Sequence, residues 1–140
     1  MSLTVGSICR SVYPEISWDA SIRDAAARMR TEKTRWLTVT AEGHVVGMVS
    51  DWDILRRAVL DGLDRDRTSV ESIMRVGLPV CSPHATPREA ARIMKRKGVR
   101  QIAVVDDAPE RAIVGIVRLE DILRALPPGE LEREFLLALM

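Results

Sequence analysis

Apolar positions along this chain follow two periods, and the change from one period to the other marks the expected elements. Within residues 22–29 and 87–94, apolar side chains recur at the three-to-four-residue spacing of a helix face. Ser21 and Thr86 precede these runs, and each is followed three positions later by an acidic residue, which is the pattern of a helix N-cap. Each predicted helix is followed by two β-prone runs: RWLTVT and HVVGMVS, then RQIAVV and AIVGIVR. The pattern predicts two helices, each leading into a β-hairpin.

This order of elements occurs twice because the chain contains an internal duplication. At an offset of 65 residues, YPEISWDASIRDAAARM falls on LPVCSPHATPREAARIM, and the offset grows to 68 after DDAPER. The phrase GMVSDWDIL, from Gly47, then matches GIVRLEDIL, from Gly115. These phrases lead into helices that we expect from about Asp51 to Leu60 and from about Leu119 to Leu126. With a short strand around Ile16 and around Cys81, each copy is expected to run strand, helix, strand, strand, helix.

The duplicated unit predicts the fold class. A three-stranded sheet with both helices on one face leaves its other face uncovered, so the two copies are expected to pack together. We therefore expect an α+β fold of two β-α-β-β-α repeats about a pseudo-twofold axis, with a C-terminal helix and a shared core. The predicted organisation is a first repeat at 1–60, a connector at 61–72, a second repeat at 73–126 and an apolar helix at 127–140.

Composition narrows the functional classes. The chain has 140 residues, of which 46% are apolar and 29% charged, and its net charge is +1, as in a soluble globular protein without a broad basic face for nucleic acid. No apolar run approaches the roughly 20 residues that cross a bilayer, and MSLTVGSICR lacks the pattern of a secretory signal, so we expect no membrane partner and a cytoplasmic location. Cys9 and Cys81 stand alone, which predicts small apolar residues rather than metal ligands.

Ser50 and Asp53 are the most informative polar residues. They fall at the start of a predicted helix, where unpaired N–H groups and the helix dipole favour an anion such as phosphate. The same two residues also suit a capping box, which stabilises a helix without any ligand. Gly47, lacking a side chain, allows close approach of a ligand or of a neighbouring backbone.

Several features together resemble a known family. They are the duplication, the SIRDAAARM and TPREAARIM helices, the SIMR segment at 72–75, and the twice-written order of Gly, apolar, any, Ser or Thr, any, any, Asp. In this combination the chain resembles a tandem pair of cystathionine β-synthase (CBS) domains, a Bateman module. The resemblance implies a regulatory module that is not an enzyme and has no catalytic cofactor. It implies an adenine nucleotide or adenosyl ligand, AMP or ATP, in a cleft between the repeats, a homodimer, and an effector protein.

The resemblance also assigns roles to residues of the first repeat. It implies that Asp53 accepts hydrogen bonds from ribose hydroxyls and that Ser50 contacts ribose or phosphate. The expected nucleotide-binding set is Gly47, Met48, Ser50, Asp53, Ile16, Ser17, Arg35, Trp36, Leu37 and Thr38. Within this set, Trp36 either stacks on the base or belongs to the core, and Arg35, like its equivalent Arg100, either reaches a phosphate or is solvated.

The second copy departs from the pattern, because Arg118 replaces the hydroxyl while Asp121 remains. Arg118 either meets a phosphate or fills the cleft and pairs with Asp121 or Glu120. The family often has proline where this chain has Thr38 and Ala103. We therefore expect one good site and a second, degenerate site formed by Gly115, Arg118, Asp121, Ile102 and Ala103.

Two other interpretations remain open at this point. The chain is alternatively a structural dimerisation module with a vestigial cleft. The apolar tail GELEREFLLALM contributes to the homodimer, docks another protein or packs within its own chain. Catalysis has the least support, since His44 and His84 have no nucleophile at a recognisable spacing.

Overall fold

The computed structural model describes residues 3–77, 79–107 and 113–126. The predicted C-terminal helix at 127–140 lies outside these residues. These described residues form thirteen elements: α1 (Val5–Ile8), β1 (Glu15–Ser17), α2 (Ile22–Glu32), β2 (Trp36–Ala41), β3 (His44–Ser50), α3 (Asp51–Ile54), the π-helix η1 (Leu55–Leu60), the 3-10 helix η2 (Val70–Ser72), β4 (Val80–Cys81), α4 (Pro87–Lys97), β5 (Gln101–Val105), β6 (Ile113–Arg118) and α5 (Leu119–Ala125).

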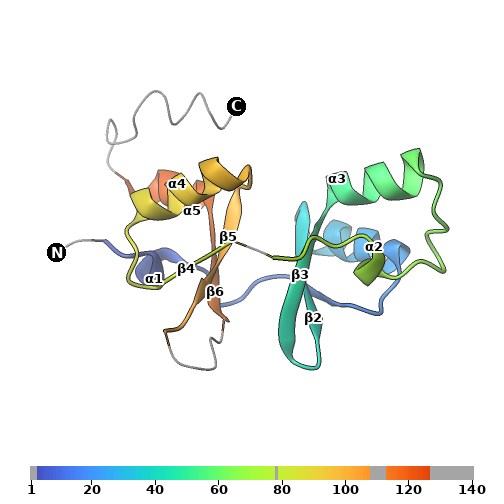
Figure 1. Cartoon of the computed structure of the whole chain (residues 1–140), viewed down its shortest axis with the longest axis horizontal. Helices are drawn as coiled ribbons and strands as arrows, with labels where there is room; N and C mark the ends of the chain where they lie inside the picture. Colours follow the sequence, from blue (N-terminus) through green and yellow to red (C-terminus); the bar gives the residue numbers. More distant parts are fainter. Residues whose placement is uncertain (1–2, 78, 108–112, 127–140) are drawn as a thin grey trace. The chain divides into compact units, whose positions relative to one another are not determined.

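Two three-stranded sheets confirm the α+β class and the repeated unit (Figure 1). In each sheet the first strand pairs in parallel with the second, and the second pairs antiparallel with the third, giving the orders β1-β2-β3 and β4-β5-β6. Both predicted hairpins are present. Both predicted caps are also present, since the side chains of Ser21 and Thr86 accept hydrogen bonds from the backbone N–H of Asp24 and Glu89.

The chain forms two compact units that do not follow the two halves of the sequence. One unit is Tyr13–Leu78, and the other combines Met1–Val12 with Pro79–Met140. We call them the first-repeat unit and the second-repeat unit. Each has its own buried core of sheet and helix side chains. In each unit, two helices and one extra segment cover the helical face of the sheet.

Each of the two extra segments precedes one repeat in the sequence but packs against the other repeat. We call residues 5–10 and 70–75 the lead-in segments. Val5 and Gly6 donate backbone hydrogen bonds to Ala85 and Pro83 in the second-repeat unit. At the equivalent positions of the first-repeat unit, Val70 and Glu71 donate to Ala20 and Trp18. The duplication therefore extends to individual backbone hydrogen bonds, and the buried side chains of Val5 and Val70 each complete a core.

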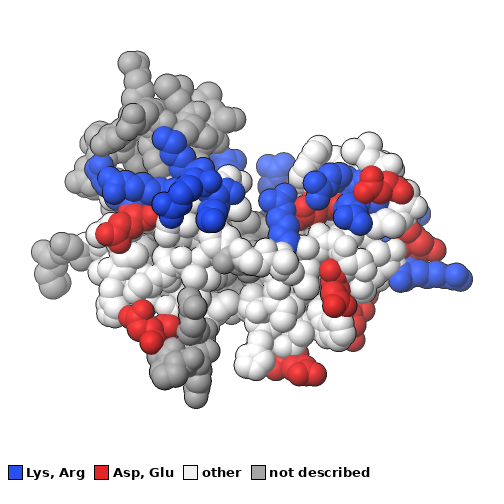
Figure 2. Space-filling model, in the orientation of Figure 1, with Lys and Arg blue, Asp and Glu red and all other residues white. Residues whose placement is uncertain are grey.

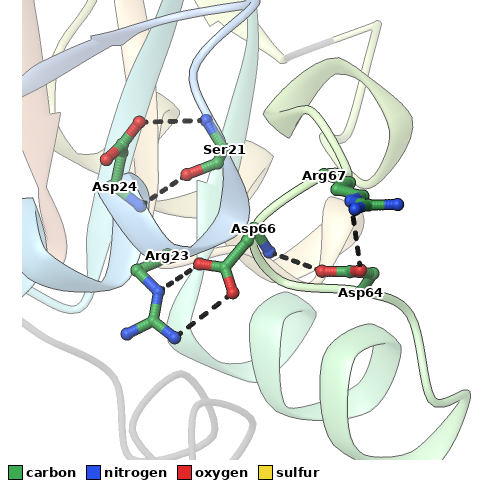
Figure 3. Close-up of polar contacts among 6 residues, drawn as sticks. All are labelled: Ser21, Arg23, Asp24, Asp64, Asp66 and Arg67. Atoms are coloured by element: carbon green, nitrogen blue, oxygen red, sulfur yellow. Dashed lines mark hydrogen bonds and ion pairs between the residues drawn. The ribbon is translucent and has the colours of Figure 1, made fainter.

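The connector lies against the start of α2 (Figure 3). Ile22 and Arg23 donate backbone hydrogen bonds to Thr68 and Arg65, which satisfies N–H groups of the first helical turn. The Arg23 guanidinium also pairs with the Asp66 carboxylate, and this hydrogen bond lowers the pKa of Asp66. The connector is thus part of the first-repeat unit rather than a free linker.

Positive charge is concentrated on one helix. Figure 2 shows Lys and Arg gathered over α4, whereas cations and carboxylates are mixed in the unit that contains α2. Lys95, Arg96 and Lys97 occupy the last turn of α4, where cations stabilise the negative end of the helix dipole. The basic surface is therefore local, in keeping with the net charge of +1.

Candidate functional site

Ser50 and Asp53 lie where the end of β3 turns into α3. The Ser50 hydroxyl accepts the Asp53 N–H at 3.2 Å, and the Asp53 Oδ2 accepts the Ser50 N–H at 2.9 Å and its hydroxyl at 3.0 Å. The capping box considered from the sequence is therefore formed. The regular helix that it opens is short, because α3 passes into the π-helix η1 at Leu55.

Arg75, which is not among the predicted binding residues, closes Asp53 off from solvent. The Arg75 Nε donates to the Asp53 Oδ1 at 3.1 Å, and the Asp53 side chain has no exposed surface, whereas that of Arg75 is 49% exposed. Arg75 ends the lead-in segment at 70–75. The guanidinium therefore covers the carboxylate on its solvent side.

The second-repeat unit repeats this arrangement. The Asp121 Oδ1 accepts from Arg10 Nε at 3.1 Å and from Arg10 Nη2 at 3.0 Å, and the Asp121 Oδ2 accepts the Arg118 N–H at 3.0 Å. The hydrogen bond to Asp121 raises the pKa of Arg10. A signal for both arginines was present in the sequence, since the 65-residue offset places SICR (7–10) on SIMR (72–75).

Gly47 and Gly115 give the lead-in segments room to cross the sheets. A Cβ at Gly47 would lie 2.7 Å from the Arg75 carbonyl oxygen, and one at Gly115 would lie 2.7 Å from that of Arg10. Next to these glycines, Arg75 exchanges two backbone hydrogen bonds with Met48, and Arg10 exchanges two with Ile116. Of the two reasons considered for the glycine, the described residues show close approach of a neighbouring backbone.

The register of β2 and β3 brings four of the predicted binding residues onto one sheet face. Trp36 lies opposite Ser50, and Thr38 lies opposite Met48. Trp36, Thr38 and Met48 are buried, yet they are not members of the helix-covered core. The Trp36 Nε1 and the Thr38 Oγ1 are buried without a hydrogen-bond partner among the described residues. Buried polar atoms without partners are rare in proteins and call for an explanation.

The other predicted residues of the first repeat lie elsewhere. The side chains of Ile16 and Leu37 belong to the helix-covered core. Ser17 is exposed, and its hydroxyl donates to Asp19 at 2.6 Å. Arg35 is exposed and pairs with Asp51 at 3.0 Å. The structure thus brings together Trp36, Thr38, Met48, Ser50 and Asp53, and it does not bring the side chains of Ile16 and Leu37 to the same face.

In the second-repeat unit the corresponding face carries Gln101, Ala103, Ile116 and Arg118. Ala103 and Ile116 pair opposite each other, in place of Thr38 and Met48, and both are buried. Ile102 belongs to the core. The Arg118 guanidinium pairs with Glu120 at 2.6 Å, which is one of the internal ion pairs considered for it. A separate pocket of this unit is lined by Val80, Cys81, Ser82, Val105, Asp106 and Asp107, and contains none of the predicted site residues.

The family follows from comparison with known proteins. The CBS domain family model matches residues 5–60 and 70–128. The chain belongs to the CBS-domain family. It is 29% identical over 107 residues to the CBS domain-containing protein YhcV of Bacillus subtilis, with 76% of this chain and 74% of that protein covered.

Solved structures of CBS proteins share the fold. The chain is similar to TA0289 of Thermoplasma acidophilum, a CBS domain protein of unknown function, with a TM-score of 0.84, 27% identity, and 99% and 76% of the two chains covered. It is also similar to the CBS domain pair of protein MJ0100, with a TM-score of 0.74, 26% identity, and 89% and 95% covered. The MJ0100 structure is a complex with 5′-methylthioadenosine and S-adenosyl-L-methionine.

Within the part of the chain that the structure describes, no group of three or more His, Cys, Asp and Glu residues is placed to hold a metal ion. No described helix has the length and apolar character needed to span a bilayer.

Proposed function

We propose that this chain is a regulatory CBS pair that binds an adenosyl ligand, AMP or ATP among the candidates, through its first repeat. The observation that carries the proposal is the pair of buried polar atoms, Trp36 Nε1 and Thr38 Oγ1, that have no hydrogen-bond partner in the described part of the chain and lie on the sheet face shared with Ser50. A bound ligand with hydrogen-bonding groups would satisfy them. The likeness to MJ0100, which holds two adenosyl compounds, supports this ligand class.

In this proposal each first-repeat residue has a defined part. Asp53 accepts the ribose hydroxyls, Ser50 contacts ribose or phosphate, and Trp36 and Thr38 face the ligand from β2. Met48 and Gly47 shape the floor from β3, while Ile16 and Leu37 take part only through backbone atoms, because their side chains are in the core. Ser17 and Arg35 reach the ligand only by leaving Asp19 and Asp51.

The second repeat is proposed to be the weaker site. Its face carries Ala103 in place of Thr38 and Gln101 in place of Trp36, and Arg118 is held by Glu120. Arg10 also makes two hydrogen bonds to Asp121, where Arg75 makes one to Asp53. These contacts favour a single strongly occupied site.

Calorimetric titration with AMP, ATP and 5′-methylthioadenosine tests the proposal. Asp53→Asn should lose binding, whereas Asp24→Asn, which alters the equivalent cap residue of α2, should bind like the wild type. A binder also raises the melting temperature with ligand concentration. Absence of binding by the wild-type protein to all three compounds would leave the scaffold interpretation.

A homodimer that passes the signal to an effector protein is part of the same proposal. The segment Asp51–Leu60 exposes four large apolar side chains: Trp52, Leu55, Val59 and Leu60, at 53%, 47%, 66% and 69%. Such a cluster on a surface helix is typical of a protein interface. Ligand binding would change the partner surface through different affinities for two arrangements of the chain.

A further inference from the structure

Arg75 and Arg10 form the same ion pair at equivalent positions of the two units. Each arginine ends a lead-in segment, and each bonds the aspartate of the twice-written phrase. The aspartate side chains are 0% and 8% exposed, whereas the arginine side chains are 49% and 45% exposed. We infer that Arg75 and Arg10 set the ligand affinity of their units, because each guanidinium closes the carboxylate and must turn away before a ribose can reach it. This inference rests on the proposed function.

Access, rather than hydrogen-bonding capacity, is what the arginine limits. A carboxylate oxygen can accept more than one hydrogen bond. Among the described residues, the Asp53 Oδ1 has one close donor, the Arg75 Nε at 3.1 Å, and Arg56 lies at 3.9 Å. The Asp53 Oδ2 is held by Ser50 from the backbone side. A ribose hydroxyl therefore has to take the position of the guanidinium at Oδ1.

The guanidinium can leave without moving the lead-in segment. Backbone hydrogen bonds between Arg75 and Met48, and the close contact with Gly47, hold the segment independently of the side chain. The half-exposed arginine side chain needs only rotation about its own bonds to reach solvent. Removing the guanidinium should accordingly open the carboxylate while the unit stays folded.

The size of the effect follows from the population of the open state. The apparent dissociation constant equals the intrinsic one divided by the open fraction. Because one partner of the ion pair is buried, we expect the closed state of the arginine to be favoured over the open state by about threefold to tenfold. Arg10 makes two hydrogen bonds to Asp121 where Arg75 makes one to Asp53, so the first repeat should open more readily.

The test is calorimetric titration of the full chain with 5′-methylthioadenosine, which carries the ribose hydroxyls but no phosphate that an arginine could bind. Arg75→Met keeps the apolar stem and removes the charge. Its dissociation constant should be about threefold to tenfold lower than that of the wild type. Arg28→Met, at an exposed arginine of α2 that pairs with Glu32, is the matched control and should bind as the wild type does.

Each outcome decides the inference. If Arg75→Met binds 5′-methylthioadenosine no more tightly than the wild type, the arginine does not gate the site; wild-type binding of AMP that Asp53→Asn abolishes would then still support the proposed function. If neither the wild type nor any variant binds an adenosyl compound, both this inference and the proposed function are wrong. Arg75→Lys keeps the charge but lacks the Nε donor and should give an intermediate affinity; it carries the test alone if Arg75→Met does not fold.

Discussion

Single residues decide how closely the lead-in segments approach the sheets. Gly47 is buried on β3, and the atoms nearest to a Cβ placed there are the Arg75 carbonyl oxygen at 2.7 Å and the Met74 Sδ at 2.8 Å. The Arg75 carbonyl oxygen cannot move aside without a cost in free energy, because the Arg75 backbone is fixed by two hydrogen bonds to Met48. The glycine is therefore a packing requirement of the ligand-free unit.

Gly47→Ala should lower the free energy of unfolding by about 2 kcal/mol, since the added methyl overlaps backbone atoms. Chemical denaturation without ligand measures the change. Gly115→Ala should behave similarly, because its Cβ would meet Arg10 at the same distance of 2.7 Å. An unchanged stability with weakened ligand binding would show instead that the glycine serves the ligand.

Cys81 illustrates how burial alters a single group. Burial raises the pKa of its thiol to about 11, from an ordinary value of 9.0. Because the pKa is higher in the folded state, the resulting stabilisation is complete below pH 9 and is lost as the pH rises toward 11. Denaturation between pH 8 and 11 should show a loss of up to about 2 kcal/mol that is reduced in Cys81→Ala. Equal pH profiles of the two proteins would contradict this.

At the scale of elements, capping residues begin three helices with the same chemistry but different consequences. Ser21 and Thr86 cap α2 and α4 through solvent-exposed hydrogen bonds. Ser50 caps α3 and also donates its hydroxyl to a fully buried carboxylate. Loss of a hydroxyl should be more costly where the acceptor is buried.

Ser50→Ala should therefore destabilise the protein by about 1–2 kcal/mol, and Ser21→Ala by about 1 kcal/mol or less. Thermal unfolding of both variants gives the comparison. A larger effect at Ser21 than at Ser50 would mean that the buried Asp53 does not depend on the hydroxyl.

The whole molecule depends on segments that cross between sequence repeats. The first-repeat unit needs Val70 and Ile73, which precede the second repeat, and the second-repeat unit needs Val5. A fragment cut at the sequence boundary thus lacks part of its core. The structural boundary at Tyr13–Leu78 retains it.

Two fragments of similar length test this organisation. Residues 13–78 should show the dispersed NMR spectrum of a folded domain, whereas residues 1–60 should not, because they lack the lead-in segment at 70–75. The two fragments are similar in length, and both contain β1, α2, β2 and β3. Equal folding of the two fragments would show that the lead-in segment is dispensable.

Assembly is the second property at this scale. Leu55→Glu with Val59→Glu should convert the proposed homodimer to a monomer, because both side chains are among the exposed apolar residues at Asp51–Leu60. Light scattering after size exclusion measures the mass. A mass that does not change would place the interface elsewhere.

Local signals predicted much of this structure. The apolar periods predicted α2 and α4, the cap residues predicted their first turns, and the β-prone runs predicted both hairpins. The spacing of Ser50 and Asp53 predicted a capping box as one of two alternatives, and the capping box is present. These features depend on neighbours within a few residues, so the sequence expresses them directly.

The partners of the lead-in segments could not be predicted in the same way. Nothing local to Arg75 indicates that its guanidinium bonds Asp53, or that Arg10 bonds a residue 111 positions away. The SICR and SIMR copies marked the two arginines as equivalent but not what they contact.

The sequence by itself determined the repeated α+β unit, its caps and hairpins, and the family, because short-range periodicity and duplication are written in the order of residues. Only the tertiary structure decided which repeat each lead-in segment completes, why Gly47 has no side chain, and that Asp53 is closed by Arg75. Those outcomes depend on contacts between distant segments, where burial of apolar side chains and pairing of a buried charge select one arrangement among many.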